Sequence, residues 1–126
     1  MAGALTISTL NNDTGVLATQ NGMTGIAKAW VYFAGATASI NNSFNVSSVT
    51  RNGTGDYTVS FTVAMANTNY CCVGSNINGN ASNNFSLIIG NAAGGATTGS
   101  CRFGAIQSGA TTAQDPANVN FVVFGN

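Results

Sequence analysis

Charge is the scarcest property of this 126-residue sequence. The chain contains no histidine and no glutamate, and 5% of its residues are charged, against about 25% in an average soluble protein. Its charged residues cancel to a net charge of zero and are Lys28, Arg51, Arg102, Asp13, Asp56 and Asp115. A chain without a basic cluster lacks the electrostatic footprint of a nucleic-acid-binding protein or of one that binds an anionic membrane.

The missing side chains also count against catalysis. Without histidine or glutamate, the usual acid–base groups and the commonest metal ligands are absent, and no serine has a histidine to activate it. Glycoside hydrolysis needs two carboxyl groups, and a turn or capping role explains each of the three aspartates. The segment NNDTG at residues 11–15 lacks the acidic repeat and the bidentate glutamate of a calcium loop. We therefore expect no enzyme activity, no cofactor and no metal.

Long apolar runs are scarce as well. No run approaches the roughly 18 residues of a membrane span, and no charged leader precedes a hydrophobic segment, so we expect no membrane insertion. Polarity comes from Asn, Thr, Ser and Gly, which together supply 60 of the 126 residues and favour turns and half-exposed strands over helices. An uncharged surface of this kind is tolerable when copies of the chain cover it, which favours a homo-oligomer.

The odd number of cysteines, three, argues against a disulfide framework. Cys71 and Cys72 are neighbours, so in a strand their side chains point to opposite faces and cannot easily bond to each other. The main interpretation is three free thiols, with Cys71 or Cys72 in the core. The alternative is a bond from Cys101 to one of the two.

Alternation of apolar and polar residues predicts an all-β fold, an antiparallel β-sandwich of about seven or eight short strands. We expect residues 1–24 to form an extended N-terminal arm that docks on a neighbouring subunit or a larger particle, and residues 25–126 to form the sandwich domain. A turn is expected at Asn41-Asn42 and a bulge at Ser47-Ser48. The predicted strands cover residues 5–10 and 16–18 in the arm, then 26–33, 36–40, 44–51, 57–63, 69–74, 85–89, 100–107 and 119–124.

The strongest local signal is the glycine-rich hairpin connection RNGTGD at residues 51–56, followed by a strictly alternating segment. Arg51 and Asp56 flank this connection and are predicted to form an ion pair across it. The predicted core comprises Val31, Phe33, Val59, Phe61, Val63, Leu87, Ile89, Phe121 and Val123.

Two groups of residues are candidates for binding. Trp30 and Tyr32 share a strand face with Lys28, and they fill a core or a subunit interface, or alternatively hold a sugar. The second group lies in two loops rich in Asn and Gly, where adaptable side chains suit a neutral glycan. These candidate receptor-facing residues are Asn76, Asn78, Asn80, Asn83, Asn84 and Asn91.

Four segments in order resemble a recurrent module of tailed-bacteriophage fibre proteins, common in phages of cyanobacteria and other aquatic bacteria and placed at the C-terminal end of longer chains. The segments are GIAKAWVYF (25–33), SFNVSSVT (43–50), NGTGDYTVSF (52–61) and DPANVNFVVFG (115–125). The resemblance covers residues 25–125, about four-fifths of the chain.

The resemblance implies a trimeric β-sandwich on the exterior of a virion, made in the host cytoplasm. The expected function is a non-enzymatic tail fibre or receptor-binding tip, whose partners are other copies, other virion proteins and a host surface glycan. A short arm stands where a long stalk is usual, so the alternative is a capsid decoration or head-fibre protein held by residues 1–24. A polysaccharide depolymerase is a distant third.

Overall fold

The structure is a computed structural model that describes residues 9–12, 15–18, 25–77, 85–89, 95–107 and 113–125. For residues 9–12, 15–18, 85–89 and 107, the description covers the backbone. Every regular element of the described residues is a β-strand, which confirms the all-β prediction. None of the described segments is a helix that could span a membrane.

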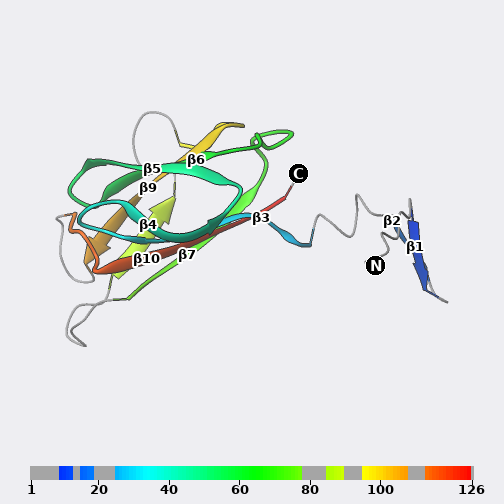
Figure 1. Cartoon of the computed structure of the whole chain (residues 1–126), viewed down its shortest axis with the longest axis horizontal. Coiled ribbons are helices and arrows are strands. Elements are labelled where there is room, and N and C mark those ends of the chain that lie inside the picture. Colours follow the sequence, from blue (N-terminus) through cyan, green and yellow to red (C-terminus); the bar gives the residue numbers. More distant parts are fainter. Residues whose placement is uncertain are drawn as a thin grey trace, which may run out of the picture.

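Two four-stranded antiparallel sheets face each other, as in a β-sandwich (Figure 1). We name each sheet after its two inner strands. The β3–β10 sheet has the order β4-β3-β10-β7 and the β6–β9 sheet has the order β5-β6-β9-β8. Their strands are β3 (Ala27–Ala34), β4 (Ser39–Phe44), β5 (Val46–Gly53), β6 (Asp56–Phe61), β7 (Cys71–Ile77), β8 (Phe85–Ile89), β9 (Ser100–Gln107) and β10 (Asn118–Phe124).

The N-terminal segment contributes a hairpin. Strands β1 (Thr9–Asn12) and β2 (Gly15–Ala18) pair with each other in a two-stranded antiparallel sheet of their own. The sequence predicted extended pieces at residues 5–10 and 16–18, and the two strands overlap these ranges.

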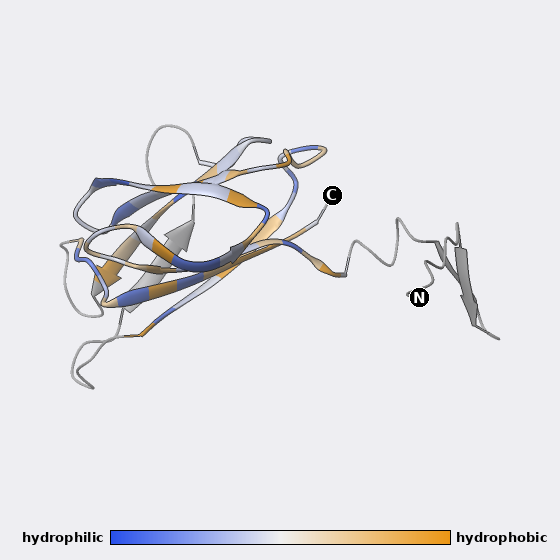
Figure 2. Cartoon of the chain, viewed as in Figure 1, coloured by the Kyte–Doolittle hydropathy of each residue, from blue (hydrophilic) through white to orange (hydrophobic). Residues whose placement is uncertain are grey.

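Hydrophobic and hydrophilic residues alternate along the inner strands (Figure 2). The inward hydrophobic residues form one core between the sheets. Phe103 of β9 stacks on Phe121 of β10, with ring centroids 4.7 Å apart and planes 8° from parallel, so an aromatic contact joins the two sheets. Six predicted core residues are confirmed as buried, and they are Val31, Phe33, Val59, Phe61, Phe121 and Val123. The side chains of Leu87 and Ile89 lie outside the description. The core also includes Ala29, Tyr57, Met65, Cys101, Phe103, Ala105 and Val119.

Val63 is a wrong core prediction, because β6 ends at Phe61 and the chain then leaves the sheet. Its side chain is 68% exposed, and Met65 enters the core instead. The turn predicted at Asn41-Asn42 is also wrong. The chain turns at residues 35–38, and Asn42 lies within β4 opposite Tyr32.

The bulge predicted at Ser47-Ser48 is confirmed. The β5–β6 register shifts between Val46 and Ser48, which leaves Ser47 as the extra residue. The hairpin that follows is confirmed as well, since Gly53 pairs with Asp56 around the turn at Thr54 and Gly55. Gly55 has φ +65°, and a Cβ there would lie 2.5 Å from the Ala105 carbonyl oxygen, so the turn requires glycine.

Candidate functional site

Trp30 and Tyr32 lie on the outward-facing side of the β3–β10 sheet. Their neighbours along β3, Val31 and Phe33, are buried in the core, and alternate residues of a strand face opposite ways. Both aromatic residues are half-buried, and neither belongs to the buried core. This placement leaves the surface interpretations of the pair and removes the core interpretation.

The strand register extends this side into a continuous apolar row. Phe44 lies opposite Trp30, Trp30 opposite Val122, and Val122 opposite Val73, so the row crosses all four strands. Directly opposed residues in antiparallel strands share a face. We call this outward side of the β3–β10 sheet the apolar face.

Uncharged polar side chains form the next row of the apolar face. Asn42, Tyr32, Asn120 and Ser75 oppose one another across the four strands, and Asn120 Nδ2 donates to Ser75 Oγ at 3.4 Å. The following row ends at Ile77, opposite Asn118. Among the described residues of this face, Lys28 at one end carries the charge, and the rows from Phe44 to Ile77 carry none.

Large apolar side chains on the apolar face are open to solvent. Phe44, Val73 and Ile77 are 54%, 55% and 52% exposed. Val122 and Phe124 are half-buried beside them. Contiguous apolar exposure of this kind marks interaction sites on soluble proteins.

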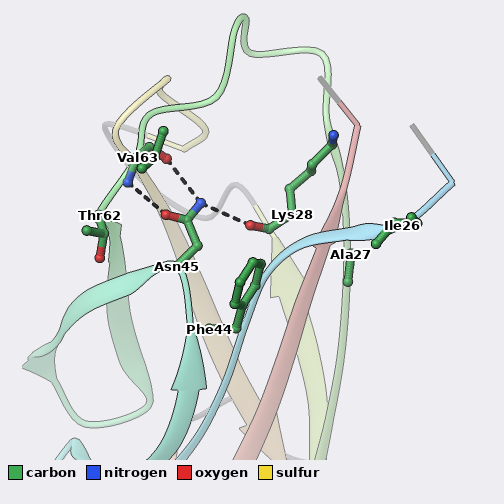
Figure 3. A pocket seen from close by; sticks show the side chains of 7 residues that line it. All are labelled: Ile26, Ala27, Lys28, Phe44, Asn45, Thr62 and Val63. Carbon is green, nitrogen blue, oxygen red and sulfur yellow. Dashed lines mark hydrogen bonds between the residues drawn. The ribbon is translucent and has the colours of Figure 1, made fainter. Parts of the chain in front are cut away.

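A pocket adjoins the apolar face where β4 passes into β5 (Figure 3). Its volume is about 440 Å³, and Phe44 and Lys28 belong to both the pocket and the apolar face. The pocket is lined by Ile26, Ala27, Lys28, Phe44, Asn45, Thr62 and Val63. Its apolar lining comes from the exposed side chains of Ile26, Phe44 and Val63.

Asn45 fixes the shape of this pocket. Its φ of 53° lies in the left-handed region that Asn tolerates better than most residues, and there the chain crosses from one sheet to the other. Its side-chain Nδ2 donates to the carbonyl oxygens of Lys28 (2.9 Å) and Val63 (3.1 Å), and its Oδ1 accepts from the Val63 N–H (2.7 Å). Asn45 therefore ties the start of β3 to the segment after β6 (Figure 3).

The ion pair predicted between Arg51 and Asp56 is wrong. Arg51 lies opposite Tyr57 in the register, whereas Asp56 precedes Tyr57 and faces the other side of the sheet. Arg51 instead binds Asp115, with Nη2–Oδ2 at 2.6 Å and Nε–Oδ2 at 3.0 Å. Asp56 binds Arg102 of β9, with Nε–Oδ1 at 2.9 Å.

Asp115 anchors the segment before β10 to the β5–β6 hairpin. Its Oδ1 accepts from the Tyr57 hydroxyl at 2.6 Å and from the Gly55 N–H at 2.8 Å, in addition to the Arg51 contacts. Burial raises the pKa of this carboxyl, but the hydrogen bonds from Arg51, Tyr57 and Gly55 outweigh burial and hold it below the ordinary value. Burial, together with this hydrogen bond, raises the pKa of Tyr57.

The hydrogen bond from Arg102 lowers the pKa of Asp56. A general acid in glycoside hydrolysis needs a raised pKa, so neither described aspartate has the environment of that group. Asp13 lies outside the described residues.

The cysteines occupy three different environments. Cys71 is exposed, Cys72 is half-buried and Cys101 is buried, and all three are free thiols. Cys72 Sγ and Cys101 Sγ are 3.6 Å apart and form a weak hydrogen bond. This bond lowers the pKa of Cys101 against the effect of burial, and it raises the pKa of Cys72 together with burial.

No known protein family, curated protein or solved structure matches this chain.

Among the candidate receptor-facing residues, Asn76 is not in a loop. It lies in β7 opposite Val119, half-buried on the inward side of the sheet, because β7 extends to Ile77. The other five candidates, Asn78, Asn80, Asn83, Asn84 and Asn91, lie outside the described residues.

Sequence reasoning missed Phe44, Val73, Val122 and Ile77 as surface residues. The alternation C-V-S-I at residues 71, 73, 75 and 77 was a signal for an outward apolar stripe. It could not show that β7 lies two strands from Trp30, because that neighbourhood depends on the strand order.

Proposed function

We propose that this chain is a non-enzymatic structural protein that assembles through the apolar face as a homotrimer. The observation that carries the proposal is the row of Phe44, Trp30, Val122 and Val73 across the whole width of one sheet. The cores of subunit interfaces are enriched in aromatic residues and depleted of charge, and the apolar face has both properties.

A second copy of the chain suits the apolar face better than a charged partner. The net charge is zero, and four of the six charged residues form two ion pairs away from this face. The Asn and Ser side chains between the apolar rows carry both donors and acceptors, so identical faces can satisfy each other reciprocally. The trimeric state, as opposed to a dimer, rests on the resemblance to phage fibre modules.

The same resemblance supports a place on the exterior of a virion, as a tail fibre or a receptor-binding tip. In this proposal, residues 1–24 act as an arm that attaches the domain to the particle. The pairing of β1 with β2 supports this division, because neither strand joins the two sheets of the sandwich. Neither Asp56 nor Asp115 has the raised pKa that the general acid of a glycosidase needs, which supports a role without that chemistry.

The virion assignment is tested by labelling intact virions of a phage that encodes this chain with a gold-tagged antibody against it. We expect label at the tail in electron micrographs. Label spread over the head would replace the fibre with a capsid decoration protein. Virions without label would overturn the assignment, while leaving the assembly through the apolar face to its own test.

A further inference from the structure

Cys72 and Cys101 approach each other from different sheets. Cys72 lies opposite Val123, whose side chain is buried, so the Cys72 side chain faces the core from edge strand β7. Cys101 is buried on β9 of the other sheet, opposite Val59. The two sulfurs are 3.6 Å apart, and a disulfide requires about 2.05 Å. Closing the bond requires the two sulfurs to approach by about 1.5 Å.

Tyr70 holds the two strands in this position. Its hydroxyl oxygen lies 2.8 Å from the Thr97 carbonyl oxygen and 2.9 Å from the Ser100 carbonyl oxygen, and these two acceptors share its single proton. Tyr70 therefore connects the residue before β7 to the start of β9. Its ring packs edge-on against Phe61 of the β6–β9 sheet at 5.8 Å. The approach of the two sulfurs therefore occurs where the two sheets are fastened to each other.

We propose that Cys72 and Cys101 are an oxidation site that forms a disulfide bond between the two sheets of one chain. The bond lies on the side of the sandwich where β7 and β8 are the edge strands, and these strands pair with β10 and β9 and not with each other. On the opposite side a single residue, Asn45, separates edge strands β4 and β5, whereas residues 78–84 separate β7 from β8. The disulfide adds a direct cross-link between the sheets on this side.

A small disulfide such as oxidised glutathione supplies the oxidant. Cys72 is the more accessible of the two sulfurs, and its proton passes to the Cys101 thiolate along their hydrogen bond. The Cys72 thiolate that results attacks the oxidised glutathione and forms a mixed disulfide, and one glutathione thiol leaves. The thiolate of Cys101 then attacks the Cys72 sulfur, forms the protein disulfide and releases the second glutathione. Two protein thiols are oxidised, one glutathione disulfide is reduced to two thiols, and the two protein protons end on these thiols.

Cys71 provides a matched control within the same strand. It is exposed and lies opposite Phe124 on the apolar face, so its sulfur points away from Cys101. Cys71→Ser should leave the oxidation unchanged. Cys72→Ser should abolish it, and because Cys72 is half-buried, a small polar replacement is compatible with folding.

The test uses the full chain, purified in reductant and then incubated with oxidised glutathione. Titration of thiols after denaturation should fall from two per chain to none in Cys71→Ser, and mass spectrometry should show that this variant has lost two hydrogens and carries no glutathione. In the unaltered protein the exposed Cys71 can carry glutathione in addition to the same intrachain bond. Cys72→Ser should retain no intrachain bond. Closing a loop of about 30 residues should raise Tm by roughly 10–20 °C, and reductant should reverse the rise.

Three results would overturn the proposal. The first is three titratable thiols after oxidation. The second is a Cys71→Ser protein that has lost the response, which would identify Cys71 as the partner of Cys101. The third is a thiol loss accompanied by cross-linked chains on a non-reducing gel, which would show bonds between molecules.

Discussion

The two outer faces of the sandwich differ in the side chains that they present to solvent. On the β6–β9 sheet, the register places Ser48, Ser60 and Ser100 in one row. Thr50, Thr58 and Arg102 follow in the next row. We call this outward side the hydroxyl face. The apolar face of the β3–β10 sheet has rows of the same geometry filled with aromatic, aliphatic and amide side chains.

This difference indicates which face is well solvated in a single chain. Hydroxyl groups are well solvated, and Arg102 on the hydroxyl face pairs with Asp56. The apolar face instead leaves Phe44, Val73 and Ile77 more than half exposed, which is unfavourable in water. A single strand of alternating residues can produce either face, so the contrast lies in the choice of outward residues and not in the fold.

The largest effect is expected when a charge is placed on the apolar face. Val73→Lys should weaken self-association by roughly 100-fold or more, because an unpaired charge buried in an interface costs several kcal/mol. Val73 is exposed in the single chain, so the fold should tolerate the change. Sedimentation velocity over a dilution series measures the effect.

Thr50→Lys is the matched control on the hydroxyl face, since Thr50 is also an exposed strand residue. It should associate like the unaltered protein. Equal effects of the two lysines would remove the distinction between the faces.

A smaller effect is expected on stability when either of the two ion pairs beside the β6–β9 sheet is broken. Asp115→Asn should lower the free energy of unfolding by about 1–3 kcal/mol, because it breaks the exposed pair with Arg51 and weakens the part-buried bonds from Tyr57 and Gly55. The Asp56 carboxylate is more exposed than that of Asp115, 31% against 16%, and accepts no bond from Tyr57 or Gly55, so Asp56→Asn should cost about 0–1 kcal/mol. Urea unfolding of both variants checks the order, and a larger cost for Asp56→Asn would contradict it.

The same two carboxyls predict the pH dependence of stability. Their pKa values in the folded chain lie below the unfolded value of about 3.9, so their stabilisation is present above that pH and is lost as pH falls through the folded pKa values. Stability should therefore decline below about pH 4. Between pH 7 and 5 it should stay constant, since the chain has no histidine. Urea midpoints at pH 7, 5 and 3 would reveal a loss above pH 5 that contradicts this account.

The smallest effect is spectroscopic and reports on the apolar face alone. Trp30 is the single tryptophan of the chain, so its fluorescence is assigned without ambiguity. Assembly should shield the indole, whereas Val73→Lys should shift the emission to longer wavelength and increase quenching by acrylamide. Thr50→Lys should match the unaltered protein. Identical quenching in all three would show that assembly does not cover Trp30.

Local patterns predicted the parts of the fold that depend on neighbouring residues. The hairpin at Gly55, the bulge at Ser47 and the bounds of β8 and β9 were all read from alternation and turn chemistry, and the structure confirms them. The prediction that Val63 lies in the core was wrong because the alternation of apolar and polar residues continues past the point where the chain leaves the sheet. That departure is set by hydrogen bonds from Asn45, which is distant in the sequence.

The candidate site could be predicted only in part from the sequence, because its neighbouring residues come from strands that are distant along the chain. Trp30 and Tyr32 stood out by residue type, and their position on a shared face was correct. Their neighbours Val122 and Val73 come from strands far along the chain, and strand order brings them together. Likewise, the expected partner of Arg51 was the nearest aspartate in the sequence, but Asp115 from the segment before β10 binds it.

Sedimentation equilibrium of the full chain at micromolar concentration tests the central claim most directly. If the apolar face joins three copies, the mass should be about 38 kDa, three times the 12.7 kDa of one chain. A mass of 12.7 kDa at these concentrations would contradict an interface on the apolar face.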